Sequence, residues 1–234
     1  MKVALITGGS KGIGYSIAQK LSKEGWNVAI TGRSQSSLDH AENSLKLDGH
    51  AGVLALQADV RNLDALNSAV ESVINKWGQI DALIANAGVG HFDSIETLSA
   101  NDWSEMIDTN LTGVFNSIKA CLEALKRSEG YIITIGSLAG VNFFAGGSGY
   151  NATKFGLVGF TQAVMLDLRP LNIKVSTIMP GSVATHFNNR TPSEADAWKI
   201  QPEDIGELVL GLLKMNPRTL PSKIEVRPSR PKGS

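Results

Sequence analysis

The stretch that decides the fold is Thr7-Gly8-Gly9-Ser10-Lys11-Gly12-Ile13-Gly14, between an apolar run at residues 2–7 and a helical pattern at residues 15–23. A glycine-rich turn from a strand into a helix lets the backbone approach a pyrophosphate, and the new helix points unpaired N–H groups at it. The spacing T-G-x-x-x-G-x-G is neither G-x-G-x-x-G nor a Walker loop, because Lys11 precedes a glycine. Taken alone, the loop is also compatible with an ordinary strand-to-helix turn.

Further β-rich runs alternate with helical patterns along the chain, at residues 27–31, 53–58, 80–85, 131–136, 173–178 and 223–226. Tyr131-Ile132-Ile133-Thr134-Ile135 is nearly continuously apolar, which is typical of a strand buried on both faces. One intervening helix is indicated by apolar residues spaced three or four apart: Leu63, Leu66, Ala69, Val70, Val73 and Ile74. The alternation predicts an α/β fold, a Rossmann-type doubly wound parallel sheet of about seven strands between two helical layers.

Composition indicates one globular domain. The 234 residues are 42% hydrophobic and 19% charged, and no linker divides them, so we expect one domain over residues 1–226 and a flexible tail over residues 227–234. The 22 basic residues balance the 22 acidic ones, which argues against nucleic-acid and membrane partners. Cys121 is the only cysteine, and the first apolar run is too short for a signal peptide. We therefore expect a cytoplasmic protein.

The end of the second predicted strand indicates which dinucleotide is bound. It reads Thr31-Gly32-Arg33-Ser34 and has no acidic residue to accept a bond from the adenosine ribose. Arg33, with Lys11 approaching from the first loop, favours the 2′-phosphate of NADPH over NADH. The alternative is that Arg33 is a solvated surface cation.

Two further strand ends carry polar residues that suit the same ligand. Asp59-Val60 follows the third strand, where the carboxylate would take the adenine amino group and the valine would cover the ring. Asn86-Ala87-Gly88 follows the fourth. Each pair alone is also ordinary turn chemistry.

A candidate catalytic group follows the fifth strand. Ser137 comes directly after that strand, and Tyr150 and Lys154 lie on a predicted helix at residues 150–168. The i, i+4 spacing places the phenol and the ammonium on one helical face. A neighbouring cation lowers the pKa of a tyrosine and so suits it to exchange a proton with a carbonyl or alcohol oxygen. On its own, the pair is also compatible with an ordinary helix surface.

Together these motifs resemble the short-chain dehydrogenase/reductase family, in its compact single-domain branch. The resemblance runs from about Val3 to about Val226. Its motifs come in the family's order: Thr7–Gly14, Asp59, Asn86-Ala87-Gly88, Asn110, Ser137, Tyr150, Lys154 and Pro180-Gly181.

The resemblance implies a role for each catalytic residue. Tyr150 would be the acid in reduction and the base in oxidation, and Ser137 would orient the substrate oxygen. Lys154 would hold the nicotinamide ribose and lower the pKa of Tyr150. Asn110, in a helix expected at about residues 101–127, would anchor a water in a proton relay with Lys154.

The resemblance also implies a cofactor site. Asn86 would steady the centre of the sheet, Gly88 would leave room for the cofactor, and Val183 and Thr185 in a P-G-x-V-x-T loop would contact the carboxamide. The hydride would come from the pro-S face of C4. The residues expected to bind the cofactor are Gly8, Ser10, Lys11, Gly12, Ile13, Gly14, Arg33, Ser34, Asp59, Val60, Asn86, Ala87, Gly88, Tyr150, Lys154, Pro180, Gly181, Val183 and Thr185.

Three loops are expected to face the substrate, at residues 89–93, 138–149 and 185–201. They offer a largely apolar and aromatic set: His91, Phe92, Val141, Phe143, Phe144, His186, Phe187 and Trp198. This favours an apolar or aromatic carbonyl, or a 3-oxoacyl thioester, although the same side chains would also serve simply to pack the loops. The four histidines, His40, His50, His91 and His186, show no close pairing or ligand spacing, so no metal is expected.

The sequence thus predicts an NADPH-preferring oxidoreductase that reversibly reduces a ketone or aldehyde. A non-catalytic NAD(P)-binding sensor or scaffold on the same fold is the alternative, and an epimerase or dehydratase with retained NAD is a second enzymatic one. In the relatives, the helices at about residues 101–127 and 150–168 build dimers and tetramers, so the resemblance implies a homodimer or homotetramer. The other partner would be a small-molecule carbonyl or alcohol.

Overall fold

The computed structural model describes residues 1–48 and 52–230, and its centre is a parallel sheet in the order β3-β2-β1-β4-β5-β6-β7. The strands are β1 (Val3–Thr7), β2 (Asn27–Gly32), β3 (Val53–Gln57), β4 (Ala82–Ala85), β5 (Tyr131–Ile135), β6 (Lys174–Pro180) and β7 (Lys223–Val226). Each lies within two residues of its predicted bounds. The predicted fold class is confirmed.

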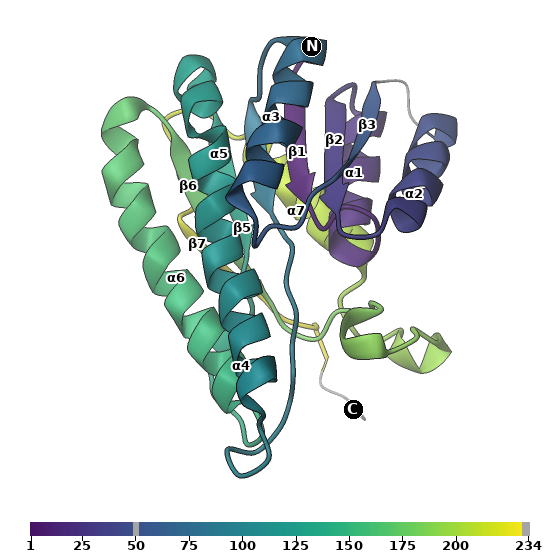
Figure 1. The fold of residues 1–234 in the computed structure, drawn as a ribbon, viewed down its shortest axis with the longest axis vertical. Helices are drawn as coiled ribbons and strands as arrows, with labels where there is room; N and C mark the ends of the chain where they lie inside the picture. Colours follow the sequence, from purple (N-terminus) through teal and green to yellow (C-terminus); the bar gives the residue numbers. More distant parts are fainter. Residues whose placement is uncertain (49–51, 231–234) are drawn as a thin grey trace.

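Helices cover both faces of the sheet (Figure 1). One face packs against α1 (Gly12–Lys23), α2 (Gln35–Asp48) and α7 (Pro202–Lys214). The other packs against α3 (Leu63–Trp77), α5 (Gly113–Ser128) and α6 (Ser148–Leu168). Short 3₁₀ turns lie at Leu138–Gly140, Arg169–Leu171, Phe187–Asn189 and Glu194–Asp196.

The side-chain alternation of β1 shows why the sheet needs two helical layers. Val3 and Leu5 pack into the core beneath α3, α5 and α6, whereas Ala4 and Ile6 pack into the core beneath α1, α2 and α7. All four side chains are buried. Because both faces of the strand are apolar, each must be covered by helices rather than exposed to solvent.

The helix expected at about residues 101–127 runs without a break from Ala100 to Ser128 and contains a π-helical turn. α4 (Ala100–Ile107) is capped by Ser99, whose Oγ accepts a hydrogen bond from the N–H of Asp102 at 3.0 Å. A π-helical turn at Asp108–Thr112 then leads into α5. The predicted helix is therefore confirmed, and the π turn within it, which carries Asn110, is the feature that the sequence did not indicate.

The strand order places the functional end of the sheet. The connection after β1 runs to α1 on one face, and that after β4 runs to α4 and α5 on the other, so the order reverses between β1 and β4. In doubly wound sheets ligands bind at the carboxyl ends of the strands beside this reversal.

Parts of the sequence predictions fall outside the described residues. His50 and residues 231–234 lie there, and the flexibility expected from residue 227 onward stays a prediction. Within the described residues, none of the helices combines the length and apolarity needed to cross a membrane.

Candidate active site

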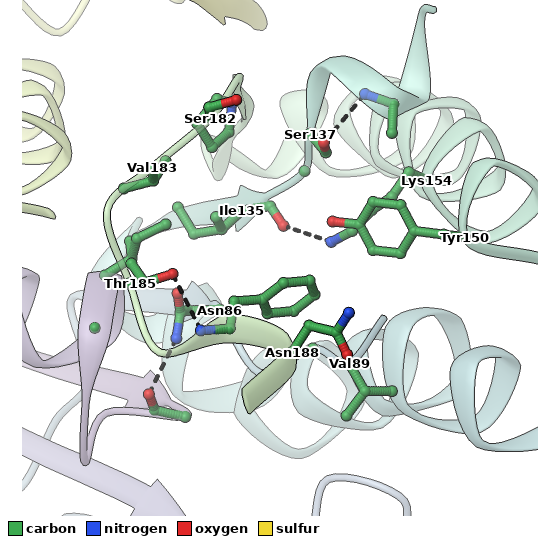
Figure 2. A pocket seen from close by; sticks show the side chains of 18 of the residues that line it. Asn86, Val89, Ile135, Ser137, Tyr150, Lys154, Ser182, Val183, Thr185 and Asn188 are labelled. Atoms are coloured by element: carbon green, nitrogen blue, oxygen red, sulfur yellow. Dashed lines mark hydrogen bonds between the residues drawn. The ribbon is translucent and has the colours of Figure 1, made fainter. Parts of the chain in front are cut away.

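A cavity of about 1170 Å³ opens at the carboxyl ends of the strands, beside the reversal in strand order. Figure 2 shows Tyr150 and Lys154 on one side of it and the loop through Ser182, Val183 and Thr185 on another. Nearly all the site residues predicted from the sequence line this cavity. The exceptions are Gly14, Ser34 and Asn110.

The glycine-rich loop forms one wall with its backbone. Gly8 and Gly12 have φ angles of 65° and 56°, a region that glycine enters without strain. A Cβ on Gly8 would lie only 3.0 Å from the Cα of Ala87. α1 begins at Gly12 beside the cavity, and Lys11 before it makes no side-chain capping bond. The first N–H groups of α1 therefore suit a pyrophosphate.

Asn86 joins the ends of β1 and β4. Its Nδ2 donates to the carbonyls of Thr7 at 2.9 Å and Gly8 at 3.1 Å, and Thr7 Oγ1 accepts from its N–H at 3.1 Å. Gly14 packs against this junction, since a Cβ there would lie 2.5 Å from the same Nδ2. Gly14 therefore contributes by close packing behind the loop rather than by lining the cavity.

The end of β2 supplies cations to the cavity. Arg33 lines it together with Lys11, and the side chain of Arg33 is 57% exposed. Ser34 instead caps α2, because its Oγ accepts a hydrogen bond from the N–H of Ser37 at 3.3 Å. Ser34 is therefore a capping residue in this structure.

Asp59, at the end of β3, has a partner that the sequence did not reveal. The Nη2 of Arg61 donates to its carboxylate at 2.6 Å, and Nε donates at 3.0 and 3.1 Å. The hydrogen bonding from Arg61 holds the pKa of Asp59 below its usual range. Asp59 and Val60 both line the cavity, where we expected them.

His91 also has partners, which corrects the expectation that the histidines lack ligand spacing. Its Nε2 lies 2.8 Å from Oε2 of Glu105, and its Nδ1 lies 3.5 Å from Oδ1 of Asp102. Ligand atoms of these three side chains lie close enough to hold a cation. Each of the three is partnered by another, however, and Glu105 also pairs with Arg33 at 3.4 Å. The spacing of Asp102 and Glu105 on α4 does not indicate that His91, from a separate loop, lies beside them.

Ser137, Tyr150 and Lys154 meet in the cavity wall between β5 and α6 (Figure 2). Lys154 Nζ donates to the carbonyl of Ile135 at 3.2 Å and lies 5.6 Å from the centre of the Tyr150 ring. Ser137 Oγ accepts from the N–H of Ala139 at 3.1 Å and is hydrogen-bonded to the phenol of Tyr150. The arrangement can present a proton and a second hydrogen bond to one ligand oxygen.

Burial controls the protonation of this group. It raises the pKa of Tyr150 to about 12, and the hydrogen bond with Ser137 opposes it only in part. It lowers the pKa of Lys154 to about 8. The expectation that Lys154 brings the phenol towards neutrality is wrong for this structure, because desolvation disfavours the tyrosinate more than its neighbours favour it.

Asn110 is held behind the cavity by the π turn. Its Nδ2 donates to the carbonyl of Val89 at 2.9 Å and to Thr153 Oγ1 at 3.0 Å, and its Oδ1 accepts from the N–H of Val89 at 2.8 Å. A Cβ on Gly88 would lie 3.2 Å from that Oδ1 and 3.8 Å from Lys154 Nζ. Asn110 thus lies near Lys154, and its part in a water relay stays a prediction.

The loop after β6 crosses the cavity towards α1. Val183 forms a parallel bridge with Ile200, and Thr185 Oγ1 accepts a hydrogen bond from the N–H of Phe187 at 3.3 Å. A Cβ on Gly12 would lie 3.4 Å from Thr185. The loop therefore reaches the glycine-rich wall.

Aromatic rings surround the phenol of Tyr150. Phe92 meets it edge-on, with centroids 5.2 Å apart and planes at 79°, and Phe187 lies 5.9 Å away. The cavity lining includes most of the expected substrate-loop residues: Phe92, Phe143, Phe144, His186, Phe187 and Trp198. His91 and Val141 are not part of it, since His91 turns towards Glu105.

Further cations line the cavity, and the sequence did not indicate them. Arg190, Arg227 and Arg230 line it. Pro228 lies close to Gly181, beside the loop that follows β6. Because residues 227–234 look like a polar, proline-rich end, the sequence offered no signal that this segment reaches the site.

Known proteins resemble the chain over most of its length. A family model described as short chain dehydrogenase matches residues 2–196. A 3-oxoacyl-(acyl-carrier-protein) reductase of Staphylococcus aureus is 34% identical over 195 residues, 82% of this chain and 79% of that protein. A trans-4-hydroxycyclohexanecarboxylate dehydrogenase of Sinomonas cyclohexanicum is 34% identical over 90% of this chain and 85% of its own.

Solved structures agree in fold. An alcohol dehydrogenase from the archaeon Thermococcus sibiricus, complexed with 5-hydroxy-NADP, superimposes with a TM-score of 0.93 at 30% identity, covering 99% of each chain.

Proposed function

Because the chain belongs to the short-chain dehydrogenase family, we propose that it is an NADPH-dependent carbonyl reductase in which Tyr150 donates the proton. The observation that carries the proposal is the meeting of Ser137, Tyr150 and Lys154 in one cavity wall, opposite the uncapped start of α1. A pyrophosphate held at α1 and a carbonyl held at Tyr150 would then share one cavity.

The protonation of the site suits reduction. The buried phenol of Tyr150, with a pKa of about 12, keeps its proton at neutral pH and can give it to a carbonyl oxygen. Ser137 would hold that oxygen through a second hydrogen bond. NADPH, when bound, supplies the hydride. In the opposite direction the tyrosinate form of Tyr150 would accept the alcohol proton.

The end of β2 supports NADPH over NADH. Arg33 and Lys11 line the cavity there, and no carboxylate follows β2 directly. A guanidinium binds a phosphate with two charge-assisted hydrogen bonds, which a ribose hydroxyl does not provide. The Thermococcus sibiricus enzyme, complexed with 5-hydroxy-NADP, offers a related precedent.

The lining supports an apolar carbonyl substrate that carries an anion away from the reacting oxygen. Phe92 and Phe187 surround Tyr150, whereas Arg190 and Arg230 line the cavity and make no ion pair with any residue in the described ranges. Lys199, by contrast, is paired with Asp196. A ring or acyl chain would contact the aromatic side chains, and a carboxylate or a phosphate-bearing thioester arm would meet the arginines.

We also propose a homodimer or homotetramer through α5 and α6. Phe115 on α5, Phe160 on α6 and Leu111 in the π turn before α5 line a shallow hollow of about 380 Å³. Phe115 and Phe155 are each more than 40% exposed there, which is unusual for aromatic rings facing water. The mass of the particle in solution would test this.

The cytoplasm stays the proposed location, in keeping with the free buried thiol of Cys121.

A panel of carbonyl compounds tests the proposed function. The panel pairs each apolar ketone with its carboxylate-bearing analogue and adds a 3-oxoacyl thioester, and the readout is the loss of NADPH absorbance. We expect turnover with NADPH and a lower KM for the anionic member of each pair. Arg230→Ala should remove that difference without changing the Kd of NADPH.

Two results would contradict the proposal. Binding of NADPH without turnover of any member would favour the non-catalytic sensor or scaffold. If each apolar ketone and its carboxylate-bearing analogue had equal KM values, the proposed reductase activity would stand, and the proposal of an anionic substrate would be wrong.

A further inference from the structure

We propose that Glu105 is a specificity-determining residue for the cofactor, because its carboxylate competes with the 2′-phosphate of NADPH for the guanidinium of Arg33. The proposal rests on the proposed function, since it assumes that Arg33 meets this phosphate. It adds a residue that lies outside the cavity lining and comes from a different part of the fold.

The contact joins two distant elements. Arg33 follows β2, and Glu105 lies near the end of α4, 72 residues later in the chain. Arg33 Nη1 donates to Oε1 of Glu105 at 3.4 Å. Arg33 lines the cavity and Glu105 does not, so the pair draws the guanidinium towards the cavity margin.

Glu105 is fixed in this position from its other side. His91 Nε2 lies 2.8 Å from Oε2 of Glu105, and His91 is itself flanked by Asp102 at 3.5 Å. Glu105 therefore keeps one oxygen for His91 and offers the other to Arg33. The hydrogen bonds from His91 and then Arg33 hold the pKa of Glu105 below its usual range, so the carboxylate is charged at neutral pH.

A charged carboxylate at this point has two consequences for a 2′-phosphate. First, Arg33 must leave Glu105 or divide its hydrogen bonds between two anions. Second, the phosphate approaches a negative charge that an unphosphorylated ribose does not feel as strongly. Both effects weaken NADPH binding and leave NADH binding nearly unchanged, so Glu105 reduces the preference that Arg33 creates.

Other charges near Glu105 do not remove the effect. Arg61 is close enough to sense Glu105 and Asp108, but its guanidinium is committed to Asp59 through three hydrogen bonds. Arg33 also acts on the carboxyl of Asp59 through its charge, but among the described residues its ion pair is with Glu105 alone, and Asp59 is hydrogen-bonded to Arg61. The competition is therefore between one guanidinium and two anions.

Cofactor binding to Glu105→Gln tests the proposal. Glutamine keeps an oxygen that can accept from His91 and removes the charge that attracts Arg33. Titration calorimetry would compare NADPH with NADH, and 2′,5′-ADP with 5′-AMP, so that the adenosine end is probed without turnover. We expect Kd for NADPH and 2′,5′-ADP to fall about three- to tenfold, with NADH and 5′-AMP unchanged. The gain should shrink at high salt.

Two controls isolate the pair. Glu123→Gln removes the same charge from α5, where Glu123 pairs with Lys126 at 2.7 Å, and should leave every Kd unchanged. In an Arg33→Ala background, Glu105→Gln should increase the affinity for NADPH much less, since the competition needs the guanidinium.

Each contrary outcome has a distinct meaning. Unchanged or weaker NADPH binding in Glu105→Gln overturns the inference. It is also overturned if the affinity for 5′-AMP rises as much as that for 2′,5′-ADP, or if the affinity for NADPH rises equally when Arg33 has been replaced by alanine. If the wild-type protein binds neither NADPH nor 2′,5′-ADP, the proposed cofactor is wrong and the inference fails with it. Tight wild-type binding with an unaffected variant overturns the inference alone.

Discussion

Lys154 Nζ lies 5.6 Å from the centre of the Tyr150 ring, one helical turn away on α6, and both side chains are buried. Burial moves their pKa values in opposite directions, to about 12 for the phenol and about 8 for the ammonium. Both shifts favour the uncharged form. At neutral pH the phenol is uncharged in both the folded and the unfolded chain, so burial costs stability only at Lys154, where a substitution can measure the cost.

Lys154→Met should stabilise the fold at neutral pH while abolishing turnover. A lysine whose pKa falls from 10.5 to about 8 is charged in both states at pH 7, and the folded state bears the cost of burying that charge. Methionine fills a similar volume without it. We expect the free energy of unfolding at pH 7 to rise by on the order of 3 kcal/mol, measured by urea denaturation.

The pH dependence of that difference checks its origin. Between pH 8 and 10.5 the unfolded chain holds the Lys154 proton and the folded protein does not, so wild-type stability rises with pH. The advantage of Lys154→Met should therefore shrink across this window. A difference that stays constant from pH 7 to 10.5 would show that lost packing or hydrogen bonding, rather than charge burial, separates the two proteins.

Reduction and oxidation should respond oppositely to alkaline pH. Above pH 8 Lys154 loses its proton, so we expect kcat/KM for carbonyl reduction to fall. Oxidation of the alcohol needs the tyrosinate form of Tyr150 to accept the alcohol proton. Because the pKa of this phenol is raised, that form becomes more abundant as the pH rises, and the oxidation rate should increase towards pH 10. Steady-state rates in both directions from pH 6 to 10 measure this. A reduction rate that climbs above pH 8 would contradict the assignment.

Local spacing explains why much of the site was predictable. The glycine loop and the strand ends at Asp59, Asn86 and Ser137 are visible in the sequence, and parallel strands bring such ends to one edge of a sheet. Tyr150 and Lys154 share one helix face by their spacing alone. The fold class follows from the apolar runs in the same way.

Contacts between distant segments explain what was not predictable. Asn110, within the π turn, is hydrogen-bonded to Val89 and Thr153, and no local pattern in the sequence indicates these contacts. The pairing of Arg33 with Glu105 spans 72 residues, and the bidentate hold of Arg61 on Asp59 depends on a side-chain rotamer. The pKa shift of Tyr150 depends on how deeply the folded chain buries it.

Arg33→Ala should weaken NADPH binding about 10- to 100-fold, because it removes a charge-assisted contact to the 2′-phosphate. NADH binding should change less than about threefold, since its ribose offers no phosphate to lose. Fluorescence titration of each reduced cofactor gives both constants. Equal loss for the two cofactors would mean that Arg33 is a surface cation supporting the fold near β2.

Gly14→Ala should destabilise the protein by about 1–3 kcal/mol, because the new methyl group would collide with the backbone carbonyl oxygen of Gly8 and with Asn86 Nδ2. Gly211→Ala is a matched control on α7, where no atom lies within 4 Å of the added carbon. There alanine should stabilise by about 0.5–1 kcal/mol through helix propensity. Urea denaturation compares them, and similar effects at both sites would contradict the close packing of the loop.

Tyr150→Phe tests the central claim most directly, through the Kd of NADPH and the turnover of one active carbonyl substrate in the same preparation. Phenylalanine keeps the ring that packs against Phe92 and Phe187 and removes only the proton donor. The account predicts a Kd within about twofold of wild type and turnover reduced about 10²- to 10⁴-fold. Turnover that survives the substitution would show that another group supplies the proton.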